Sequence, residues 1–389
     1  MDFTSLINEI LRGFASFSLG NAVMVAVGLV LIYLAIAKEY EPVLLLPIGF
    51  GCILANLGMA VNMAPNACSS ILDQNIFTVL YCAGIRTELF PLLIFIGVGA
   101  MIDFSPLLAM PQMVLLGVFP HFNIFATLIV ATLFGFDLKQ AASIGVIGAM
   151  DGPTAIFLTT KLAPELLGPI AVAAYAYMSL VPIIQPPIMR LLTTKKERMI
   201  RMEYSPRPVS KLARIIFPVM ITVVVSLIAP QAAPLIATLM LGNFLRESGV
   251  VDRLSKAAQN EIINVATLFL ALAIGTTMTA ESFLNWQTLS VLALGLFAFI
   301  VGTASGLLFA KLMNFISGGK INPLIGACGI SAFPMSARLS AKMALDADYD
   351  NFIIMHALGS NTGGQLASVV AGGLLLVLVT VITGGLPVP

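Results

Sequence analysis

The sequence predicts an all-α polytopic membrane protein made of two related halves, because of its composition, its apolar stretches and an internal repeat. Of its 389 residues, 59% are hydrophobic and 10% are charged, and the mean hydropathy is +1.00. Ordinary soluble domains carry roughly 25% charged residues. The formal net charge of +1 argues against a global electrostatic role, so we expect no nucleic-acid partner.

Apolar stretches long enough to cross a bilayer recur along the whole chain. A spanning helix needs about 20 mostly apolar residues. Candidate spans lie near residues 17–37, 41–61, 89–109, 113–136, 166–192, 211–229, 232–245, 261–280, 288–312 and 352–384, and two further apolar segments, 140–163 and 321–345, are interrupted. We expect an N-terminal half, residues 1–205, and a C-terminal half, residues 206–389, within a single membrane-embedded unit.

Basic residues gather in the connection between the two halves. By the positive-inside rule this connection is cytoplasmic. The alternative to a pure orientation signal is a docking surface for a cytoplasmic partner or anionic lipid. The residues are Arg190, Lys195, Lys196, Arg198, Arg201, Arg207, Lys211 and Arg214.

The first interrupted segment, residues 140–163, contains an isolated carboxylate. Asp151 is the only acidic or basic residue between Lys139 and Lys161. It stands in Gly148-Ala-Met-Asp151-Gly-Pro-Thr, where Gly and Pro break a helix. At bilayer depth the freed N–H and C=O groups must face protein, a cavity or a bound ion, and an intramembrane carboxylate is a candidate functional residue.

A second interrupted segment, residues 321–345, corresponds in register to the first. Corresponding broken segments in two halves indicate a transporter binding site near the midplane, whereas the weaker interpretation is that Gly and Pro serve close helix packing. We expect the repeats to be inverted, although the letters alone leave a parallel arrangement open. At a constant offset of 181 residues, the equivalent pairs are Gly145 and Gly326, Pro153 and Pro334, and Lys161 and Lys342.

The second interrupted segment carries an amide, hydroxyls and a guanidinium in place of the acid. Asn322, Ser331 and Arg338 supply these groups. Arg338 would either hold a carboxylate through a bidentate fork or neutralise Asp151, and both roles stay open.

Two polar residues outside the interrupted segments are further candidates. Asn361 lies in Gly359-Ser-Asn361-Thr-Gly-Gly364, where clustered glycines let the backbone approach a ligand; a helix–helix hydrogen bond is the alternative. Tyr177 precedes a Pro-interrupted stretch, and on its own it would be an ordinary interhelical hydroxyl.

Three motifs together resemble the β subunit of the sodium-pumping, biotin-dependent decarboxylases, a family of membrane complexes acting on oxaloacetate, methylmalonyl-CoA, glutaconyl-CoA or malonate. The likeness runs from about residue 17 to residue 385. The motifs are Gly148-Ala-Met-Asp151-Gly-Pro-Thr-Ala-Ile-Phe157, then Ala176-Tyr177-Met-Ser-Leu-Val-Pro-Ile-Ile-Gln-Pro-Pro187, then Asn322-Pro-Leu-Ile-Gly326 with Ser331-Ala-Phe-Pro-Met-Ser-Ala-Arg338.

The resemblance implies a division of labour between subunits. A cytoplasmic carboxyltransferase α subunit would move CO2 onto a biotin carrier protein, and this chain would decarboxylate the carboxybiotin. Release of CO2 would drive Na+ outward and consume a proton. The complex would include a small membrane anchor subunit and lie in the cytoplasmic membrane of a bacterium as a multi-pass assembly, and a homo-oligomer within it stays open.

The resemblance also implies a set of site residues. The catalytic set is Asp151, Tyr177 and Arg338; the set binding the biotin head group is Arg338, Asn361 and Asn322; the Na+ ligands are Asp151, Asn322, Gly326 and Ser331. The chemistry agrees, because a small hard cation prefers oxygen ligands, and decarboxylation leaves a ureido nitrogen that needs a proton, which Asp151 or Tyr177 would supply. We further expect Na+ and H+ to compete for Asp151.

A different function would fit the same repeat. A Na+-coupled secondary carboxylate transporter would show paired broken helices without any decarboxylation. A carboxyltransferase and a biotin carrier encoded beside this chain would favour the decarboxylase. The carboxyltransferase subunit would select the acid or acyl-CoA, so this sequence does not identify the substrate.

Overall fold

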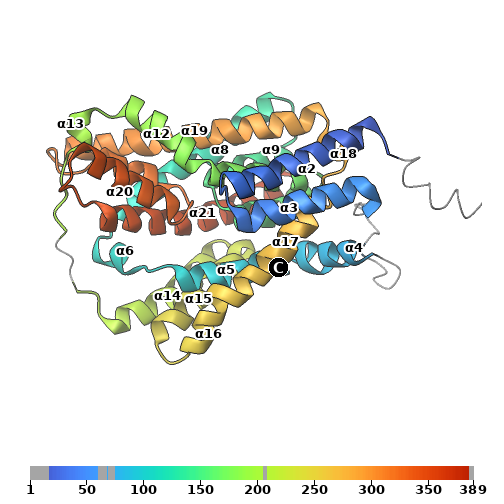
Figure 1. Cartoon of the computed structure of the whole chain (residues 1–389). Helices are drawn as coiled ribbons and strands as arrows, with labels where there is room; N and C mark the ends of the chain where they lie inside the picture. The colour runs from blue at the N-terminus through green and yellow to red at the C-terminus, as the bar shows by residue number, and fades with distance from the viewer. Residues whose placement is uncertain (1–16, 60–67, 69–74, 205–207, 385–389) are drawn as a thin grey trace, which may run out of the picture.

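The computed structural model describes residues 17–59, 68, 75–204 and 208–384. Every regular element in these ranges is helical, which confirms the predicted all-α class. Figure 1 shows most helices running roughly side by side, with α13 (Lys195–Arg198) at the left end of the bundle and α4 (Ile76–Leu80) at the right. The predicted boundary between residues 205 and 206 lies outside the described residues, and the division into halves stays a prediction.

The part of the chain before the basic connection forms mostly short and broken helices. In order these elements are α2 (Leu19–Ala37), α3 (Pro42–Leu54), η1 (Ala55–Met59), α4, η2 (Tyr81–Arg86), α5 (Leu89–Met101), α6 (Ser105–Ala109), α7 (Met113–Val118), η3 (Phe119–His121), α8 (Phe122–Leu133), α9 (Leu138–Gly145), η4 (Val146–Ala149), α10 (Gly152–Leu162), η5 (Pro164–Leu166), α11 (Leu167–Ser179), α12 (Val181–Leu192) and α13.

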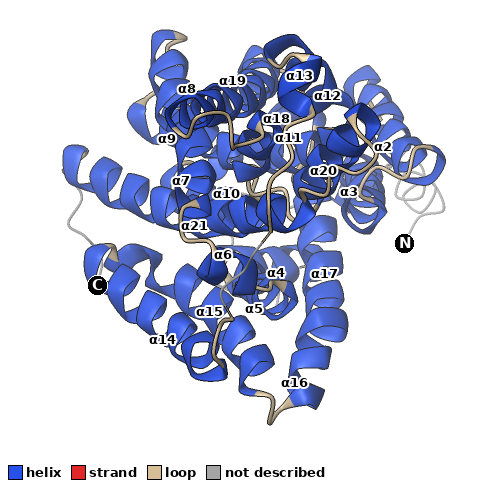
Figure 2. Ribbon diagram, turned by 90° about the vertical axis from the view of Figure 1, so that its left-hand side faces the viewer, coloured by secondary structure: helices blue, strands red, loops and turns tan. Residues whose placement is uncertain are grey.

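The part after the connection contains the longest helices. Its elements are α14 (Lys211–Ile228), η6 (Pro230–Ala232), α15 (Ala233–Ser248), α16 (Asp252–Ala257), η7 (Ala258–Ile262), α17 (Ile263–Gly275), α18 (Ala280–Phe283), α19 (Trp286–Ile316), η8 (Pro323–Gly329), α20 (Met335–Ala347) and α21 (Ile354–Ile382). Figure 2 shows α14, α15 and α16 grouped below the remaining helices.

Six of the described helical segments are long and apolar enough to cross a membrane, and two bent pairs raise the number to eight. The chain is therefore a multi-pass membrane protein. The six are Leu19–Ala37, Met113–Leu133, Lys211–Ile228, Asp252–Gly275, Trp286–Ile316 and Ile354–Ile382. The bent pairs are Ile76–Arg86 with Leu89–Met101, at 58°, and Pro164–Met178 with Val181–Leu192, at 63°. Two predicted spans are shorter than expected, since Pro42–Gly58 and Ala233–Ser248 fall below 18 residues.

Small residues let these helices approach closely. A Cβ added at Gly28 of α2 would lie 2.7 Å from the carbonyl oxygen of Gly49 in α3. A Cβ added at Gly49 would lie 2.7 Å from the carbonyl oxygen of Gly28. Larger side chains there would separate the two backbones, so this pair is a small-residue contact of the kind common in membrane helices.

Both predicted interruptions are breaks between helices. In the first, α9 and η4 end in Met150, which has a φ of 56°, and α10 begins after the extended Asp151. In the second, the 3₁₀ helix η8 is followed by an extended stretch and then by α20. Pro153 and Pro334, an equivalent pair of the repeat, both stand where the second helix starts. Whether the two halves are inverted stays a prediction.

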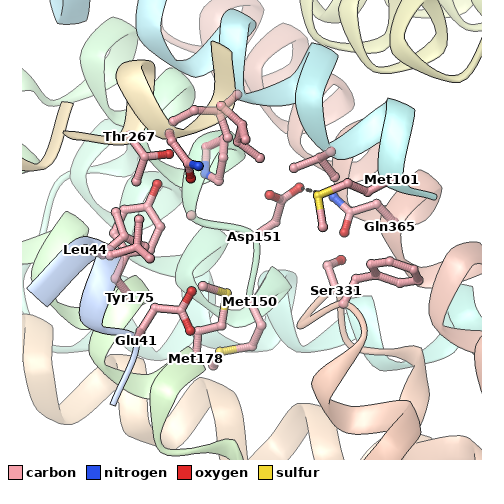
Figure 3. A pocket seen from close by; sticks show the side chains of 18 of the residues that line it. Glu41, Leu44, Met101, Met150, Asp151, Tyr175, Met178, Thr267, Ser331 and Gln365 are labelled. Atoms are coloured by element: carbon pink, nitrogen blue, oxygen red, sulfur yellow. Dashed lines mark hydrogen bonds between the residues drawn. The ribbon is translucent and has the colours of Figure 1, made fainter. Parts of the chain in front are cut away.

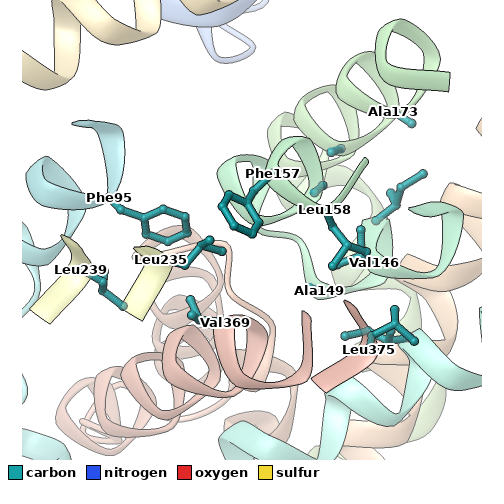
Figure 4. Close-up of a cluster of buried hydrophobic side chains, with 14 of the residues drawn as sticks. Phe95, Val146, Ala149, Phe157, Leu158, Ala173, Leu235, Leu239, Val369 and Leu375 are labelled. Atoms are coloured by element: carbon teal, nitrogen blue, oxygen red, sulfur yellow. The ribbon is translucent and has the colours of Figure 1, made fainter. Parts of the chain in front are cut away.

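Apolar side chains from several helices hold the first break in place. Phe157 and Leu158 of α10 are 1% exposed. Figure 4 shows them among Phe95 of α5, Leu235 of α15 and residues of α21 and η4, so distant parts of the chain meet at this helix.

The basic connection is pinned to the second break. Asn322 and Asn351 both donate from Nδ2 to the carbonyl oxygens of Arg198 and Ile200, at 2.9 to 3.1 Å. Arg201 pairs with Asp348 at 2.6 Å. Of the eight basic residues named from the sequence, Arg207 lies outside the described residues. The cytoplasmic placement of the connection stays a prediction.

A disulfide that the sequence did not suggest links Cys68 to Cys82. Cys82 belongs to η2, directly after α4, at the end of the bundle away from α13 (Figure 1). The other two cysteines, Cys52 and Cys328, are buried and free.

Candidate functional site

Asp151 stands at the N-cap of α10 and is 5% exposed. Its Oδ2 accepts hydrogen bonds from Thr154 Oγ1 at 2.6 Å, Ser368 Oγ at 2.8 Å and Gln365 Nε2 at 3.0 Å. Ser368 and Gln365 belong to α21, and Figure 3 shows Gln365 beside Asp151. All three donors are neutral, so hydrogen bonds solvate this carboxylate but nothing among the described residues balances its charge.

The two breaks meet at a backbone hydrogen bond. Ser331 N–H donates to the carbonyl oxygen of Ala149 at 3.1 Å, which is two residues before Asp151. The Ser331 hydroxyl donates to Gly364 O at 3.0 Å and lies 3.2 Å from His121 Nε2. Because non-helical backbone at membrane depth must be satisfied by protein or ligand, this pairing explains how both breaks are tolerated.

Buried amides satisfy other carbonyls that the breaks release. Asn361 Nδ2 donates to Cys328 O at 3.0 Å and Ile330 O at 2.8 Å. Asn123 Nδ2 donates to Gly148 O at 2.8 Å, and Gln185 Nε2 donates to Ala327 O at 3.0 Å. In each of these three amides the oxygen is buried and has no hydrogen-bond partner among the described residues. Such acceptors are expected to meet an ordered water or an ion.

A cavity of about 290 Å³ opens beside Asp151. No lysine, arginine or histidine of the described residues lines it. Figure 3 shows its polar groups reaching in from several elements. Its polar and aromatic lining residues are Glu41, Asp151, Tyr175, Gln259, Asn264, Thr267, Ser331, Phe333 and Gln365.

The structure brings together some of the predicted site residues and not others. Asp151 and Ser331 share the cavity, and Asn361 supports the break that carries Ser331. Tyr177 instead donates to Leu292 O at 2.5 Å and does not line the cavity. Arg338 is exposed on the first turn of α20.

Arg338 forms no ion pair with Asp151, whose carboxylate oxygen accepts only from the neutral donors named above. Of the two roles left open for Arg338, the structure therefore does not display neutralisation of Asp151.

Asn322 and Gly326 take structural positions. Asn322 is fully buried, caps η8 by accepting from Leu324 N–H at 3.1 Å, and binds the basic connection. A Cβ at Gly326 would lie 2.0 Å from Gly306 O, so Gly326 permits η8 to contact α19. Neither residue lines the cavity beside Asp151.

Sequence reasoning missed Thr154, Gln365 and Ser368, the donors to Asp151, and also Tyr175. A Cβ at Gly152 would lie 2.1 Å from Tyr175 Cε1, so this ring covers the start of α10. A usable signal existed for Ser368 and Gln365, because both lie within one or two turns of Asn361 in an otherwise apolar helix.

Comparison with known proteins decides between the two functions that the repeat allowed. The model of the Na+-transporting oxaloacetate decarboxylase beta subunit family matches residues 20–379. The chain belongs to this family. The family consists of subunits of multi-subunit decarboxylases, so the predicted relationship is confirmed and a secondary carrier is not supported.

Relatives with different named substrates are similar over almost their whole length. The methylmalonyl-CoA decarboxylase subunit beta of Veillonella parvula is 51% identical over 376 residues, 97% of each chain. The glutaconyl-CoA decarboxylase subunit beta of Acidaminococcus fermentans is 50% identical over 377 residues, also 97% of each chain. The oxaloacetate decarboxylase beta chain of Klebsiella pneumoniae is 47% identical over 425 residues, covering 95% of this chain and 98% of its own.

Proposed function

We propose that this chain is the membrane subunit that decarboxylates carboxybiotin and couples CO2 release to outward Na+ transport. The observation that carries the proposal is the uncompensated carboxylate of Asp151 beside a cavity that no described basic residue lines, in a family of Na+-transporting decarboxylases. A biotin carrier protein would present the carboxybiotin, and a carboxyltransferase α subunit would load it. A small anchor subunit and the cytoplasmic membrane of a bacterium complete the proposed setting.

Asp151 would be the charged ligand of Na+. Thr154, Ser368 and Gln365 surround its carboxylate within 3.0 Å, and hydroxyl and amide oxygens are suitable ligands for a hard cation. Ser331 would add an oxygen from the second break, because it lines the same cavity. Asn322 and Gly326 would act on Na+ binding indirectly, by holding η8 in place.

Arg338 would serve the anionic substrate, since its guanidinium is exposed and carries a fixed charge beside the second break. Loss of CO2 breaks the N–C bond of carboxybiotin, and the ureido nitrogen takes a proton. Tyr177 would act by positioning, because its hydroxyl ties α11 to α19 through Leu292 O. Asn361 would likewise orient the break that faces the biotin head group.

The test is CO2 release from free carboxybiotin by the purified complex, with and without Na+, for wild type and Asp151→Asn. We expect Na+-stimulated release in the wild type and its loss in the variant. Asp137→Asn is a matched control, since Asp137 also caps a helix but lies exposed at the start of α9. Equal Na+ stimulation in wild type and Asp151→Asn would contradict the proposal.

Competition between Na+ and H+ at Asp151 makes a second test. A proton on the carboxylate would exclude the cation, so the apparent affinity for Na+ should fall as the pH is lowered. An apparent affinity that stays constant over the pH range in which Asp151 titrates would remove this part of the proposal.

A further inference from the structure

The cavity beside Asp151 contains a second carboxyl group. Glu41 lies in the link between α2 and α3, and its half-buried side chain lines the same cavity. Figure 3 shows Glu41 and Asp151 reaching into it from different sides. Two acidic groups and no basic group among the described residues lining about 290 Å³ favour a bound cation, because buried like charges raise each other's energy.

The backbone at Glu41 is held in an uncommon conformation. Glu41 has a φ of 37° and Glu39 a φ of 55°, both in the left-handed region that non-glycine residues seldom adopt. Such conformations persist where the surrounding structure enforces them, and they cluster at functional sites. Here they turn the chain tightly enough to present Glu41 to the cavity at the start of α3.

The carboxylate of Glu41 does not cap helix α3. Glu41 is the N-cap residue of α3, where an acidic side chain usually accepts from the first N–H groups. Only its backbone oxygen does so, accepting from Leu44 and Leu45. No hydrogen bond or ion pair to the Glu41 carboxylate occurs among the residues that the structure describes.

The two carboxyls therefore differ in their surroundings. Asp151 accepts hydrogen bonds from three side-chain donors, while Glu41 faces the apolar side chains of Leu44 and Met178. A carboxyl without donors in such a setting is favoured in its protonated form.

The facing groups supply no charge that would prevent this. Among the described residues that line the cavity, the only other titratable groups are Asp151 and Tyr175 of α11. The packed helices α5 and α17 contribute apolar and uncharged polar side chains there, and Lys38 and Glu39 on the link itself are exposed.

An independent feature indicates that the cavity holds a polar occupant. Thr267 of α17 is 8% exposed and lines the cavity, and its hydroxyl has no hydrogen-bond partner in the described chain. Figure 3 shows this side chain on the wall opposite Gln365. A hydroxyl that lines a cavity without a protein partner is satisfied by what fills the cavity, so a water or a hydrated cation is expected beside Thr267.

We infer that Glu41 is a proton-binding carboxyl of this cavity, separate from the Na+-binding Asp151. This inference rests on the proposed function. A proton on Glu41 leaves the cavity with the charge of Asp151 alone, whereas its release adds a second negative charge that attracts Na+. Na+ binding and proton binding then oppose each other through the cavity, and the effect is reciprocal.

The test measures Na+ binding to the purified complex by titration calorimetry between pH 5.5 and 8.5, in buffers of different ionisation enthalpy. These buffers report the protons released per Na+ bound. In the wild type we expect proton release, and tighter Na+ binding as the pH rises. In Glu41→Gln a fraction of the proton release should be lost. Na+ should bind roughly tenfold more weakly at the high-pH end, because a negative charge that attracts the cation within the same cavity is removed.

Glu39→Gln is the matched control, because Glu39 shares the left-handed backbone but is exposed. It should bind Na+ and release protons as the wild type does. Glu41→Asp keeps the carboxyl and should release protons with a shifted pH midpoint, which covers the case in which Glu41→Gln fails to assemble.

Different outcomes would contradict the role of Glu41 and the proposed function of the chain. Unchanged proton release in Glu41→Gln, or an unchanged pH midpoint in Glu41→Asp, with Na+ binding intact, overturns the role of Glu41. Wild-type Na+ binding by a complex carrying Asp151→Asn overturns the proposed function instead.

Discussion

At the scale of single residues, the neighbours Asp151 and Gly152 have complementary tasks. Asp151 supplies the charge, and Thr154, Ser368 and Gln365 orient its carboxylate. Gly152 supplies space, because the ring of Tyr175 occupies the volume that a side chain would need. The Gly-Pro pair after the acid thus does more than break the helix, since it also brings an aromatic wall against the site.

Gly152→Ala should impair Na+ binding without removing any ligand. The added Cβ would lie 2.1 Å from Tyr175 Cε1, so the ring or the start of α10 must move. We expect Na+-dependent CO2 release to fall at least tenfold while the complex still assembles, about 1.4 kcal/mol of transition-state stabilisation. Gly359→Ala is the control, because its nearest neighbour is the flexible Met113 side chain at 3.3 Å. Equal losses in both variants would contradict this role for Gly152.

The sequence indicated Asp151 but not its surroundings, for physical reasons. A lone carboxylate between helix breakers is conspicuous in an apolar stretch, whereas Thr154 and Ser368 resemble ordinary helix residues. Tyr175 and Tyr177 are two positions apart on α11, which rotates them about 200° around a helix. Only one can face the cavity, and nothing in the letters says which.

At the scale of elements, two asparagines fasten the basic connection to the second break. Asn322 and Asn351 are fully buried and donate to the same two carbonyl oxygens, of Arg198 and Ile200. Each oxygen has two lone pairs and can accept both bonds. The connection in which the basic residues gather is therefore attached to η8 and α20 rather than hanging free.

Asn322→Ala should loosen this attachment and weaken Na+ binding only slightly, through the loosened η8. Each lost hydrogen bond costs about 1 kcal/mol, and the two carbonyls keep their bonds to Asn351. We expect limited trypsin digestion to cut after Arg198 and Arg201 several times faster than in the wild type, and faster still with Asn351→Ala added. A weakened Na+ affinity with unchanged cleavage would instead support Asn322 as a direct ligand.

The ion pair between Arg201 and Asp348 should make stability depend on pH. Hydrogen bonding to Arg201 lowers the pKa of Asp348 below its usual value. A carboxyl with a lowered folded-state pKa stabilises above its unfolded pKa of about 3.9, and this contribution is lost as the pH falls through the folded-state pKa.

Asp348→Asn should therefore lower the melting temperature at pH 7 by about 1–2 °C, as for an exposed pair, and the difference should shrink below about pH 4. Thermal unfolding of the solubilised complex at both pH values checks this. Asp350→Asn is the control, because Asp350 is more exposed than Asp348 and its contact with Arg201 is longer, at 3.3 Å. A difference that does not change with pH would mean that the pair contributes through packing.

At the scale of the whole molecule, the two ends of the bundle carry different chemistry. The basic connection lies at the end with α13, and the disulfide between Cys68 and Cys82 lies toward the end with α4 (Figure 1). Positive charge is typical of the cytoplasmic side and disulfides persist in oxidising compartments, so the two features independently predict the same orientation.

This orientation can be tested by labelling. After mild reduction, a membrane-impermeant maleimide added to intact cells should modify Cys68, but a cysteine placed at the exposed Lys196 should react only after permeabilisation. Cys68→Ser is the control for specificity, because Cys52 and Cys328 are buried. Labelling of both sites from outside, or of neither, would contradict the proposed topology.

Much of this architecture could be predicted from the sequence, since apolar length and paired breakers are direct consequences of the bilayer. The helices Met113–Leu133, Trp286–Ile316 and Ile354–Ile382 lie within a few residues of the predicted spans. The disulfide could not be predicted, because its cysteines follow no spacing pattern, and Glu41 resembled an ordinary charged residue at a helix end. The positions of the disulfide and of Glu41 depend on contacts between residues far apart in the sequence.

The absence of basic side chains from the described lining of the cavity sets an order of events. An anionic substrate approaching the carboxylate of Asp151 is repelled until a cation is present, so we expect Na+ to bind first and the carboxylated head group second. In kinetic terms, the concentration of free carboxybiotin needed for half-maximal rate should rise without limit as Na+ is withdrawn. The complex would then not decarboxylate carboxybiotin unless Na+ is bound.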